Sequence, residues 1–533
     1  MSNWRCFQTV SLCVLLLTVT ARAQSLDAGD PAAPPAADQS SFSASNQTAP
    51  AGGQSAPAAG QSANLVTCSS QLGQRIQCAV DTTAGVALVR SRGAAPCLYG
   101  DTWGFDAAGI WVSDGCSGVF LVGGLAQVKV TEVTQGAPAY VPNGGFLLFN
   151  GEKGQMYLRL FTYARYLNQR NLDETYEDAF GNTKSVQRRQ DMQLQKFFAP
   201  FSGWFLDPRF RYYLYVWSSN PSQGDPAQVV GAGNISWTWN RFVTAGFGIT
   251  SLPSTRSTEG QFPYWLGVDT RLIADEFFRG SYTTGAWLKG EIESNLKYHV
   301  MLANNLSTLG VSAAQLDNQF NTQSYALQWL PTTGEFGLFG TYGDYDYHQK
   351  LATRVGLHYT HSVEEKQSQP GTDGIENSQI RLTDGSVIFT PNLFGPGVSV
   401  NQVNYRMMSV DGGFKYLGMS VEGEYYRRWL TDYVGVNTGG IPNISDNGYQ
   451  MQTSVMAVPK VLQLYGSWSQ IFGNYGDPSD WRVGQNWYFL KQRGLRVNAE
   501  FIHANKSPVG YTAYPMPVGA NGNIFHLNLE MNF

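Results

Sequence analysis

The chain has 533 residues, of which 43% are hydrophobic, 13% aromatic and only 14% charged. This charged fraction lies well below the roughly 25% of an average soluble domain, and the length suggests at least two folded units. With a net charge of −4, the chain lacks the basic excess that phosphate binding requires. The composition therefore argues against a nucleic-acid partner and favours a β-protein whose strands face something other than water.

The first 23 residues have the features of an export signal. Arg5 gives a positive start, Val14 to Leu17 lie in a short apolar stretch, and Ala21 to Ala23 form an A-x-A cleavage site. We therefore expect a signal peptide over residues 1–23 and a mature chain beginning at Gln24. An anchoring helix is the alternative, but the apolar run is shorter than the roughly 20 residues that a span needs.

Residues 24–63 consist mostly of Ala, Gly, Pro, Ser and Gln. Such a segment buries too little apolar surface to offset its ordering entropy, so we expect a disordered linker. Beyond the signal, no stretch approaches the run of about 18 apolar residues typical of a transmembrane helix. A membrane protein without such helices has to be a closed β-barrel.

Residues 64–124 contain an even number of cysteines, which in a small exported domain predicts two disulfides among Cys68, Cys78, Cys97 and Cys116. Three pairings are open. A metal site is the alternative, but the segment has no histidine and no C-x-x-C spacing. We expect a small β-rich periplasmic domain here, followed by a connector over residues 125–153.

The second half of this segment has a recognisable pattern of glycine and tryptophan between two cysteines. It is formed by Cys97, Gly100, Trp103, Gly104, Asp106, Gly109, Ile110, Trp111, Val112, Gly115 and Cys116. The pattern resembles a small secreted bacterial domain of unknown function, and the resemblance implies no activity. Trp103 and Trp111 are candidates either for a ligand-stacking face or for packing beside the disulfides.

From residue 154 to the C-terminus, short runs alternate between apolar and polar side chains. In the last run, Phe525, Leu527, Leu529, Met531 and Phe533 share one parity, and His526, Asn528, Glu530 and Asn532 share the other. Successive side chains of a strand face opposite sides, so one side is suited to lipid and the other to a wet lumen. Phe533 at the end of the run resembles the signal that the outer-membrane barrel assembly machinery recognises.

Tight turns alternate with long polar connections along this region. The expected turns are Asp207–Pro208, Asn240–Arg241, Ser294–Asn295, Pro331 to Gly334, Leu417–Gly418, Pro459–Lys460 and Lys491 to Gly494. Tight turns on the periplasmic side and long loops outside are typical of a transmembrane antiparallel β-barrel. We expect an all-β fold with an even count of roughly 16 to 18 strands, wide enough for an aqueous channel. Our tally is about 18, and residues 363–404 are the segment that decides between the two counts.

The connection over residues 251–282 is expected to be the longest and the third on the long-loop side. It combines charged residues with Phe262, Tyr264, Trp265, Phe277 and Phe278. These aromatic side chains predict a loop that packs against something, either inside the lumen as a constriction or outside against a neighbouring subunit. Folding into the lumen is the arrangement that resemblance to general porins implies.

Across residues 155–533 the chain resembles the phosphate-selective porin O and P family. The resemblance rests on the run from Gly154 to Leu160, on the layout of tight turns and on the closing run from Phe525 to Phe533. It implies a water-filled channel, often trimeric, with arginines in the pore. Basic and acidic residues of the lumen parity nearly balance in this chain, however, so the sequence does not predict phosphate selectivity.

We therefore expect an outer-membrane porin for passive diffusion of small hydrophilic solutes, anionic ones included, with no cofactor and no enzymatic activity. Lipopolysaccharide, outer-membrane lipid and a homotrimer are the expected partners. The residues expected to line or constrict the pore are Arg159, Arg165, Arg209, Arg211, Arg256, Glu259, Arg271, Asp275, Glu276, Arg279, Arg354 and Arg496.

Two other functions remain open. In one, the barrel is mainly an anchor, and the Cys-rich domain binds peptidoglycan, another glycan or a protein. In the other, the barrel is an enzyme, but no Ser–His pair or paired-carboxylate pattern stands out. His358 and His361 do not form a good metal pair, because their spacing places them on opposite faces of a strand.

Overall fold

The computed structural model describes residues 64–122, with breaks at 72, 83–85, 92–96, 98–101 and 107. It also describes residues 139–533, with breaks at 142–143, 220–227, 260–261, 309–315, 317–319, 370–379 and 511–513. The expected signal peptide (1–23) and linker (24–63) lie outside the described residues, as does the connector up to residue 138. No helix among the described residues is long and apolar enough to cross a membrane.

The Cys-rich segment folds into two small antiparallel sheets. The first contains β1 (Asn64–Ser69), β6 (Ser117–Val122) and β3 (Val86–Ser91), and the second contains β2 (Arg75–Cys78), β5 (Gly109–Ser113) and β4 (Trp103–Asp106). The expected two disulfides are present, and their pairing is Cys68–Cys78 and Cys97–Cys116. They close on a compact core that includes Ile110, Val112 and Phe120.

The two tryptophans of this domain have different environments. Trp103 is buried in the core, where its ring lies 4.9 Å from that of Phe120. Trp111 is partly exposed on the other face of its sheet, and the Arg75 guanidinium lies 3.9 Å from its ring centroid. Core packing therefore accounts for Trp103, whereas Trp111 keeps some surface for contact with another molecule.

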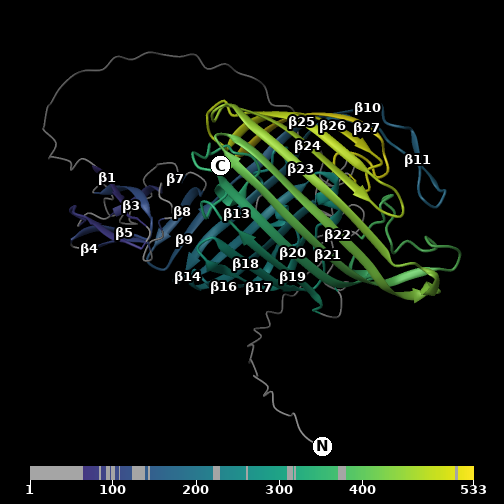
Figure 1. Cartoon of the computed structure of the whole chain (residues 1–533), viewed down its shortest axis with the longest axis horizontal. Helices are drawn as coiled ribbons and strands as arrows, with labels where there is room; N and C mark the ends of the chain where they lie inside the picture. The colour runs from purple at the N-terminus through teal and green to yellow at the C-terminus, as the bar shows by residue number, and fades with distance from the viewer. Residues whose placement is uncertain are drawn as a thin grey trace, which may run out of the picture. The chain divides into compact units, whose positions relative to one another are not determined.

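The larger part of the chain is a closed antiparallel barrel of 16 strands, all within the described residues, and Figure 1 shows these strands running slantwise side by side. They are β10 (Phe161–Arg170), β13 (Gln190–Phe205), β14 (Asp207–Ser219), β15 (Gln228–Asn240), β16 (Val243–Ser251), β17 (Tyr282–Glu293), β18 (Leu296–Ala303), β19 (Thr322–Trp329), β20 (Ala352–Glu365), β21 (Ser399–Tyr416), β22 (Met419–Val436), β23 (Ile444–Val458), β24 (Leu462–Phe472), β25 (Ser479–Trp487), β26 (Leu495–Asn505) and β27 (Gly522–Asn532).

The barrel closes where its first strand pairs with its last. β10 lies between β13 and β27, and Phe533 at the chain end exchanges two backbone hydrogen bonds with Leu160. Before β10 come β7 (Ala139–Val141), β8 (Gly145–Gly151) and β9 (Gly154–Leu158); β8 pairs with β9, which continues the line of β10 along β13. Closure removes the unpaired strand edges that an open sheet would expose.

The alternation expected from the sequence is present in the strands. In β27, Phe525, Leu527 and Leu529 are exposed on the outside, while His526 and Asn528 are buried inside. Most charged side chains of the other strands follow the same arrangement, so the barrel has an apolar exterior, and its interior combines polar groups with an apolar cluster. Antiparallel strands of this kind are stable in a bilayer, because every backbone donor and acceptor is paired within the sheet.

The expected range of 16 to 18 strands is met at its lower end, and one expectation about the connections was wrong. Our tally of about 18 strands counted an extra pair near residues 363–404, but the chain there finishes β20, forms a loop over 366–398 and starts β21. That loop is also longer than the connection over 252–281. The described short elements within the loops are β11 (Thr175–Glu177), β12 (Thr183–Ser185), α1 (Ile273–Phe278), η1 (Arg256–Thr258), η3 (Leu338–Gly340), η4 (Lys366–Ser368) and η5 (Thr438–Gly440).

Candidate functional site

The loop over residues 252–281, here called the inner loop, lies inside the barrel. It joins β16 to β17, the fifth and sixth strands of the barrel, as the sequence predicts. Its described side chains are nearly all buried, including charged ones such as Arg256, Asp275 and Arg279. The aromatic residues of the loop therefore indicated correctly that it packs against something, and that something is the inner face of the wall.

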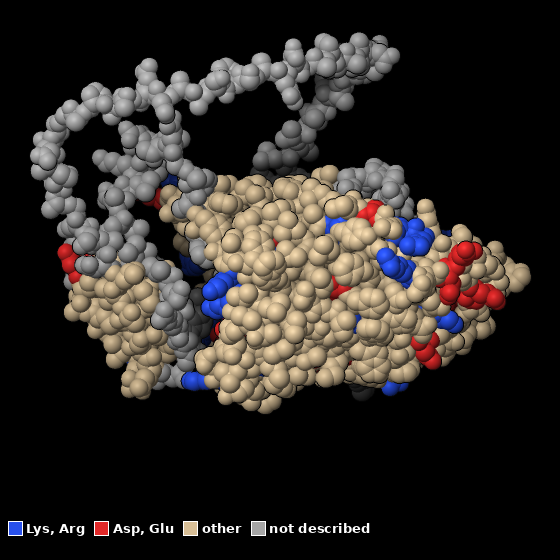
Figure 2. Space-filling view, turned by 90° about the horizontal axis from the view of Figure 1, so that it is seen from above, with Lys and Arg blue, Asp and Glu red and all other residues tan. Residues whose placement is uncertain are grey.

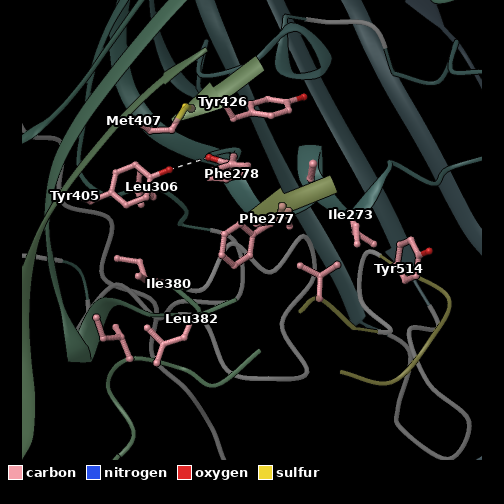
Figure 3. Close-up of a cluster of buried hydrophobic side chains, with 14 of the residues drawn as sticks. Ile273, Phe277, Phe278, Leu306, Ile380, Leu382, Tyr405, Met407, Tyr426 and Tyr514 are labelled. Atoms are coloured by element: carbon pink, nitrogen blue, oxygen red, sulfur yellow. Dashed lines mark hydrogen bonds between the residues drawn. The ribbon is translucent and has the colours of Figure 1, made fainter. Parts of the chain in front are cut away.

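Apolar contacts hold the helical part of the inner loop (Figure 3). Phe278 of α1 is fully buried, and its ring stacks on Tyr426 of β22 with centroids 5.2 Å apart. The Tyr405 hydroxyl donates a hydrogen bond of 2.8 Å to the Phe278 carbonyl. Other loops contribute to the same cluster through Leu306, Ile380, Leu382 and Tyr514. This cluster fixes α1 against the β22–β25 side of the lumen.

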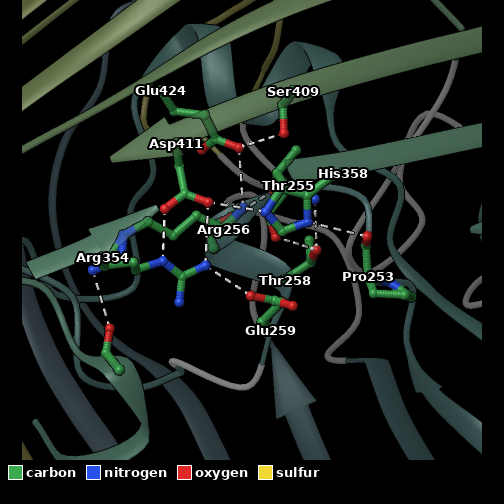
Figure 4. A network of polar contacts seen from close by, with 12 residues as sticks. Pro253, Thr255, Arg256, Thr258, Glu259, Arg354, His358, Ser409, Asp411 and Glu424 are labelled. Atoms are coloured by element: carbon green, nitrogen blue, oxygen red, sulfur yellow. Dashed lines mark hydrogen bonds and ion pairs between the residues drawn. The ribbon is translucent and has the colours of Figure 1, made fainter. Parts of the chain in front are cut away.

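A buried polar network holds the first part of the inner loop (Figure 4). Arg354 of β20 lies between two carboxylates, 2.6 Å from Asp411 of β21 and 2.8 Å from Glu259 of the loop. His358 bridges Asp411, at 3.0 Å, and the carbonyl of Pro253, at 3.3 Å. Each charged group in this network has an opposite charge or a hydrogen-bond partner. These contacts offset the free-energy cost of removing the charges from water.

Arginines of the wall also bind backbone carbonyls in the middle of the inner loop. Arg496 contacts Glu530 at 2.7 Å and donates to the Trp265 carbonyl at 2.9 Å. Arg165 donates to the Val268 carbonyl at 2.6 Å, and Arg482 donates to the carbonyl of Arg271. These guanidinium groups satisfy carbonyls that would otherwise be unpaired inside the barrel.

A second segment enters the lumen from the tight-turn side. The connection between β19 and β20, residues 330–351, is here called the inner turn. Lys415 of β21 donates to the carbonyls of Phe336 and Thr341, and the Gly343 amide donates to Glu422 at 3.0 Å. The inner turn meets the inner loop directly, because Arg256 donates to the Gly340 carbonyl at 3.1 Å and also pairs with Glu422.

His348 connects the inner turn to two carboxylates. Its ring nitrogens contact Asp344 and, at 3.1 Å, Glu335. Burial alone would lower the pKa of His348, but these two contacts outweigh it and raise the pKa from 6.5 to about 9. The same contacts hold the pKa values of Asp344 and Glu335 below their ordinary values, although burial acts in the opposite direction. His348 is therefore charged at neutral pH, and it links two carboxylates of the inner turn by ion pairs.

The lumen remains open on the side away from α1. A main cavity of about 640 Å³ lies between the inner loop and strands β13 to β18, and a second cavity of about 390 Å³ adjoins it. The two cavities share Tyr213, Thr250, Lys289 and His299 as lining residues, so they lie directly beside each other. The second cavity is also lined by Gln155, close to the tight-turn rim. This space is the candidate pore.

Aromatic and basic side chains dominate the lining of the candidate pore. Its aromatic residues include Tyr213, Trp217, Phe262 and Tyr282. Within the described residues, no carboxylate lies at ion-pair distance from Lys289, Arg211 or Arg159; Arg159 instead donates to the Tyr264 hydroxyl at 2.8 Å. The lining carboxylates are paired: Glu259 with Arg354 and Glu291 with Lys297, the latter at 3.9 Å. The pore lining is therefore net basic.

The residues expected to line or constrict the pore fall into three groups in the structure. Four of them reach the open space: Arg159, Arg211, Glu259 and Arg271. Arg209 instead lies on the tight-turn rim, where it is exposed and pairs with Asp207 at 2.7 Å. The others are buried in contacts within the inner loop or between this loop and the wall, namely Arg165, Arg256, Asp275, Glu276, Arg279, Arg354 and Arg496.

Sequence reasoning missed the inner turn and part of the pore lining. The aromatic residues Phe336, Tyr342 and Tyr345 beyond the expected turn at 331–334 carry the same signal that identified the inner loop. Lys289 has the lumen parity. Whether an acidic side chain lies near it depends on the neighbouring strands, which the alternation along one strand does not predict. Only the closed barrel shows which of the inward arginines face open space.

Comparisons with known proteins give distant likenesses. A family described as "Protein of unknown function (DUF3011)" matches residues 44–135, which include the Cys-rich segment. No curated protein matches the chain. Solved structures with a similar fold include an anion-selective porin from Comamonas acidovorans, with 9% identity and a TM-score of 0.44 over 71% of this chain and 99% of that one.

Two further structures are similar at the same level. The outer membrane channel DcaP of Acinetobacter baumannii has 9% identity and a TM-score of 0.43 over 72% of this chain and 99% of that one. OmpF of Salmonella typhi has 11% identity and a TM-score of 0.42 over 73% of this chain and 100% of that one. These likenesses are too distant to carry a functional argument, so the function has to be argued from the lumen and the wall.

Proposed function

We propose that this chain is an outer-membrane porin that forms a water-filled channel for passive diffusion of small hydrophilic solutes and favours anions. The observation that carries this proposal is the open space beside the inner loop, formed by two adjoining cavities of about 640 and 390 Å³. An anchoring barrel would have no need of a loop that is fixed to one side of the lumen while the other side stays open.

The outer surface of the wall supports a place in the membrane. Large apolar side chains are exposed all round it, among them Leu214, Leu357, Tyr425, Trp468 and Leu527. Figure 2 shows that charged side chains gather mostly toward one end of the face in view, while much of the wall beside them carries none. Such a band is stable in lipid and would be poorly soluble in water. By the usual orientation of such barrels, the tight turns face the periplasm and the long loops face outside.

The preference for anions follows from the unpaired basic side chains of the pore. Lys289 and Arg211 are exposed toward the lumen and have no carboxylate partner among the described residues. A lumen lined by one sign of charge raises the local concentration of counter-ions, and salt screens this effect. We extend the proposal to a homotrimer, to assembly through Phe533 and to the absence of enzymatic activity.

One observation keeps the anchoring function as a second candidate. Trp111 and Arg75 form a stacked, partly exposed pair on the Cys-rich domain, and an aromatic face of this kind suits a glycan or a protein. Both functions can coexist, since the pore and this domain use different residues.

Planar-bilayer recording with the purified full chain tests the channel. We expect stepwise conductance and a reversal potential in a salt gradient that indicates anion preference. K289Q/R211Q should keep the conductance steps and move the reversal potential toward zero, because it removes two unpaired cationic groups. R209Q, which removes a paired arginine from the rim, is the matched control and should leave selectivity unchanged. Bilayers that stay closed after insertion of folded protein would refute the channel.

A further inference from the structure

The outer face of β20 to β22 carries basic side chains close to the apolar band. On β21, Tyr405 and Met407 are buried in the lumen, so Arg406 between them points outward. On β22, Tyr426 and Arg428 are buried in the lumen, so Arg427 points outward and is exposed. Outward arginines are unfavourable in the middle of a bilayer and acceptable near its surface, so their depth on the wall determines what they can do.

The register of the strands places these arginines together. Arg406 lies directly opposite Trp429 of β22 and, on its other side, opposite His361 of β20. Arg427 lies opposite Met408 of β21, two residues along from Arg406. The two arginines are therefore diagonal cross-strand neighbours, a relation in which the residues lie about 7–8 Å apart and their Cβ atoms somewhat closer. Side chains as long as arginine can converge on one small group from these positions.

Their depth corresponds to the membrane surface on the long-loop side. β22 leaves its tight turn at Met419, and a tilted strand needs about 9–11 residues to cross the apolar layer. Arg427 lies at that distance from the turn. The outward row just below it is apolar and aromatic, consisting of Leu357, Val410, Tyr425 and Tyr449.

The charges of both arginines remain available. Arg427 lies over the ring of Trp429, with its guanidinium 5.3 Å from the centroid, and no carboxylate of the described residues pairs with it. Arg406 donates to the Thr431 hydroxyl at 3.3 Å, and no carboxylate of the described residues pairs with it. Asp432, the carboxylate of the next row, accepts hydrogen bonds from Asn404 at 3.2 Å and from Thr431 at 2.8 Å.

We propose that Arg406 and Arg427 bind the phosphate of an anionic lipid headgroup in the leaflet on the long-loop side. Guanidinium groups match phosphate oxygens with paired hydrogen bonds, and Trp429 beside them suits the boundary between lipid and water. His361 lies beside Arg406, and its Nε2 hydrogen-bonds the Asn404 side chain at 3.1 Å, so the two arginines supply the charge of the patch. The site lies outside the lumen and rests on the proposed function only for the placement of the wall in the membrane.

Native mass spectrometry of the full chain in an uncharged detergent tests the site, with diphosphoryl lipid A as the probe and phosphate-free lipid A as its comparison. Wild type should prefer the phosphorylated form. R406Q/R427Q should lose about tenfold or more of its affinity for that form, because it removes two charge-assisted contacts. R406K/R427K keeps both charges and should retain most of the affinity. Heat-modifiable migration on gels verifies that each variant is folded.

R209Q/R241Q is the matched control, because it removes two exposed arginines from the opposite rim. Equal affinity of R406Q/R427Q and wild type would overturn the site, as would an equal loss in R209Q/R241Q or equal binding of both lipid forms by wild type. Conductance of the same preparations separates the two proposals. R406Q/R427Q should conduct as wild type does, whereas a wild type that binds lipid A but never conducts would refute the channel and leave the lipid site standing.

Discussion

At the scale of single residues, the charged side chains of the lumen have two different roles. Arg354 neutralises Asp411 and at the same time holds Glu259 of the inner loop at 2.8 Å. Lys289 and Arg211 face the open space and have no such partner in the part of the chain that the structure describes. The sequence predicts the inward direction of all three basic residues from parity alone. It does not predict which are neutralised, since the partners come from distant parts of the chain.

The substitution Arg354→Gln tests the structural group of arginines. It leaves the buried Asp411 and the partly exposed Glu259 without their main counter-charge, and breaking a buried pair such as Arg354–Asp411 costs about 3–5 kcal/mol. We expect the free energy of unfolding in detergent to fall by that amount. Because Glu259 lines the main cavity, anion preference should also weaken. Arg209→Gln, at an exposed pair, should change neither quantity. A stable Arg354→Gln variant with unchanged selectivity would contradict this account.

At the scale of elements, the inner loop was predictable and the inner turn was not. The density of aromatic residues near Phe262 and Phe277 indicated a packed loop in a position where most loops are solvated. In the inner turn, the residues Pro331 to Gly334 resemble a complete tight turn, so the sequence predicts a short connection here instead of a segment that enters the lumen. Its fold depends on Lys415 and Glu422, which only the closed barrel brings to it.

The inner turn should depend on pH through His348. Its pKa in the folded chain is about 9, against 6.5 when free, so its charge stabilises the fold fully below pH 6.5. That contribution is lost as the pH rises through about 9. The stability difference between wild type and His348→Gln should thus be largest at acidic to neutral pH and vanish above the upper value. Guanidinium unfolding followed by tryptophan fluorescence over this range measures it, and a difference independent of pH would show that His348 is uncharged.

At the scale of the whole molecule, the alternation of apolar and polar residues along each strand produces the outer and the inner face of the barrel wall. The count of strands was uncertain from sequence because residues 366–398 contain apolar residues such as Ile380, Leu382 and Ile388, which resemble strand positions. In the structure these side chains contribute to the cluster around α1 instead. Local alternation therefore identifies the strands of the wall. The conformation of the loops that fill the lumen depends instead on contacts with distant parts of the chain.

The last prediction concerns the wall as a barrier between lipid and water. Leu527 and Asn523 lie on the same outward face of β27, Leu527 at mid-strand and Asn523 near its long-loop end. An arginine on the lipid face costs about 2–4 kcal/mol at mid-bilayer and roughly 0–1 kcal/mol near the surface. Leu527→Arg should therefore lower the folded fraction in lipid vesicles far more than Asn523→Arg, as measured by heat-modifiable migration. Equal folding of the two variants would mean that the band around Leu527 does not face lipid, because in water both positions would accept the charge.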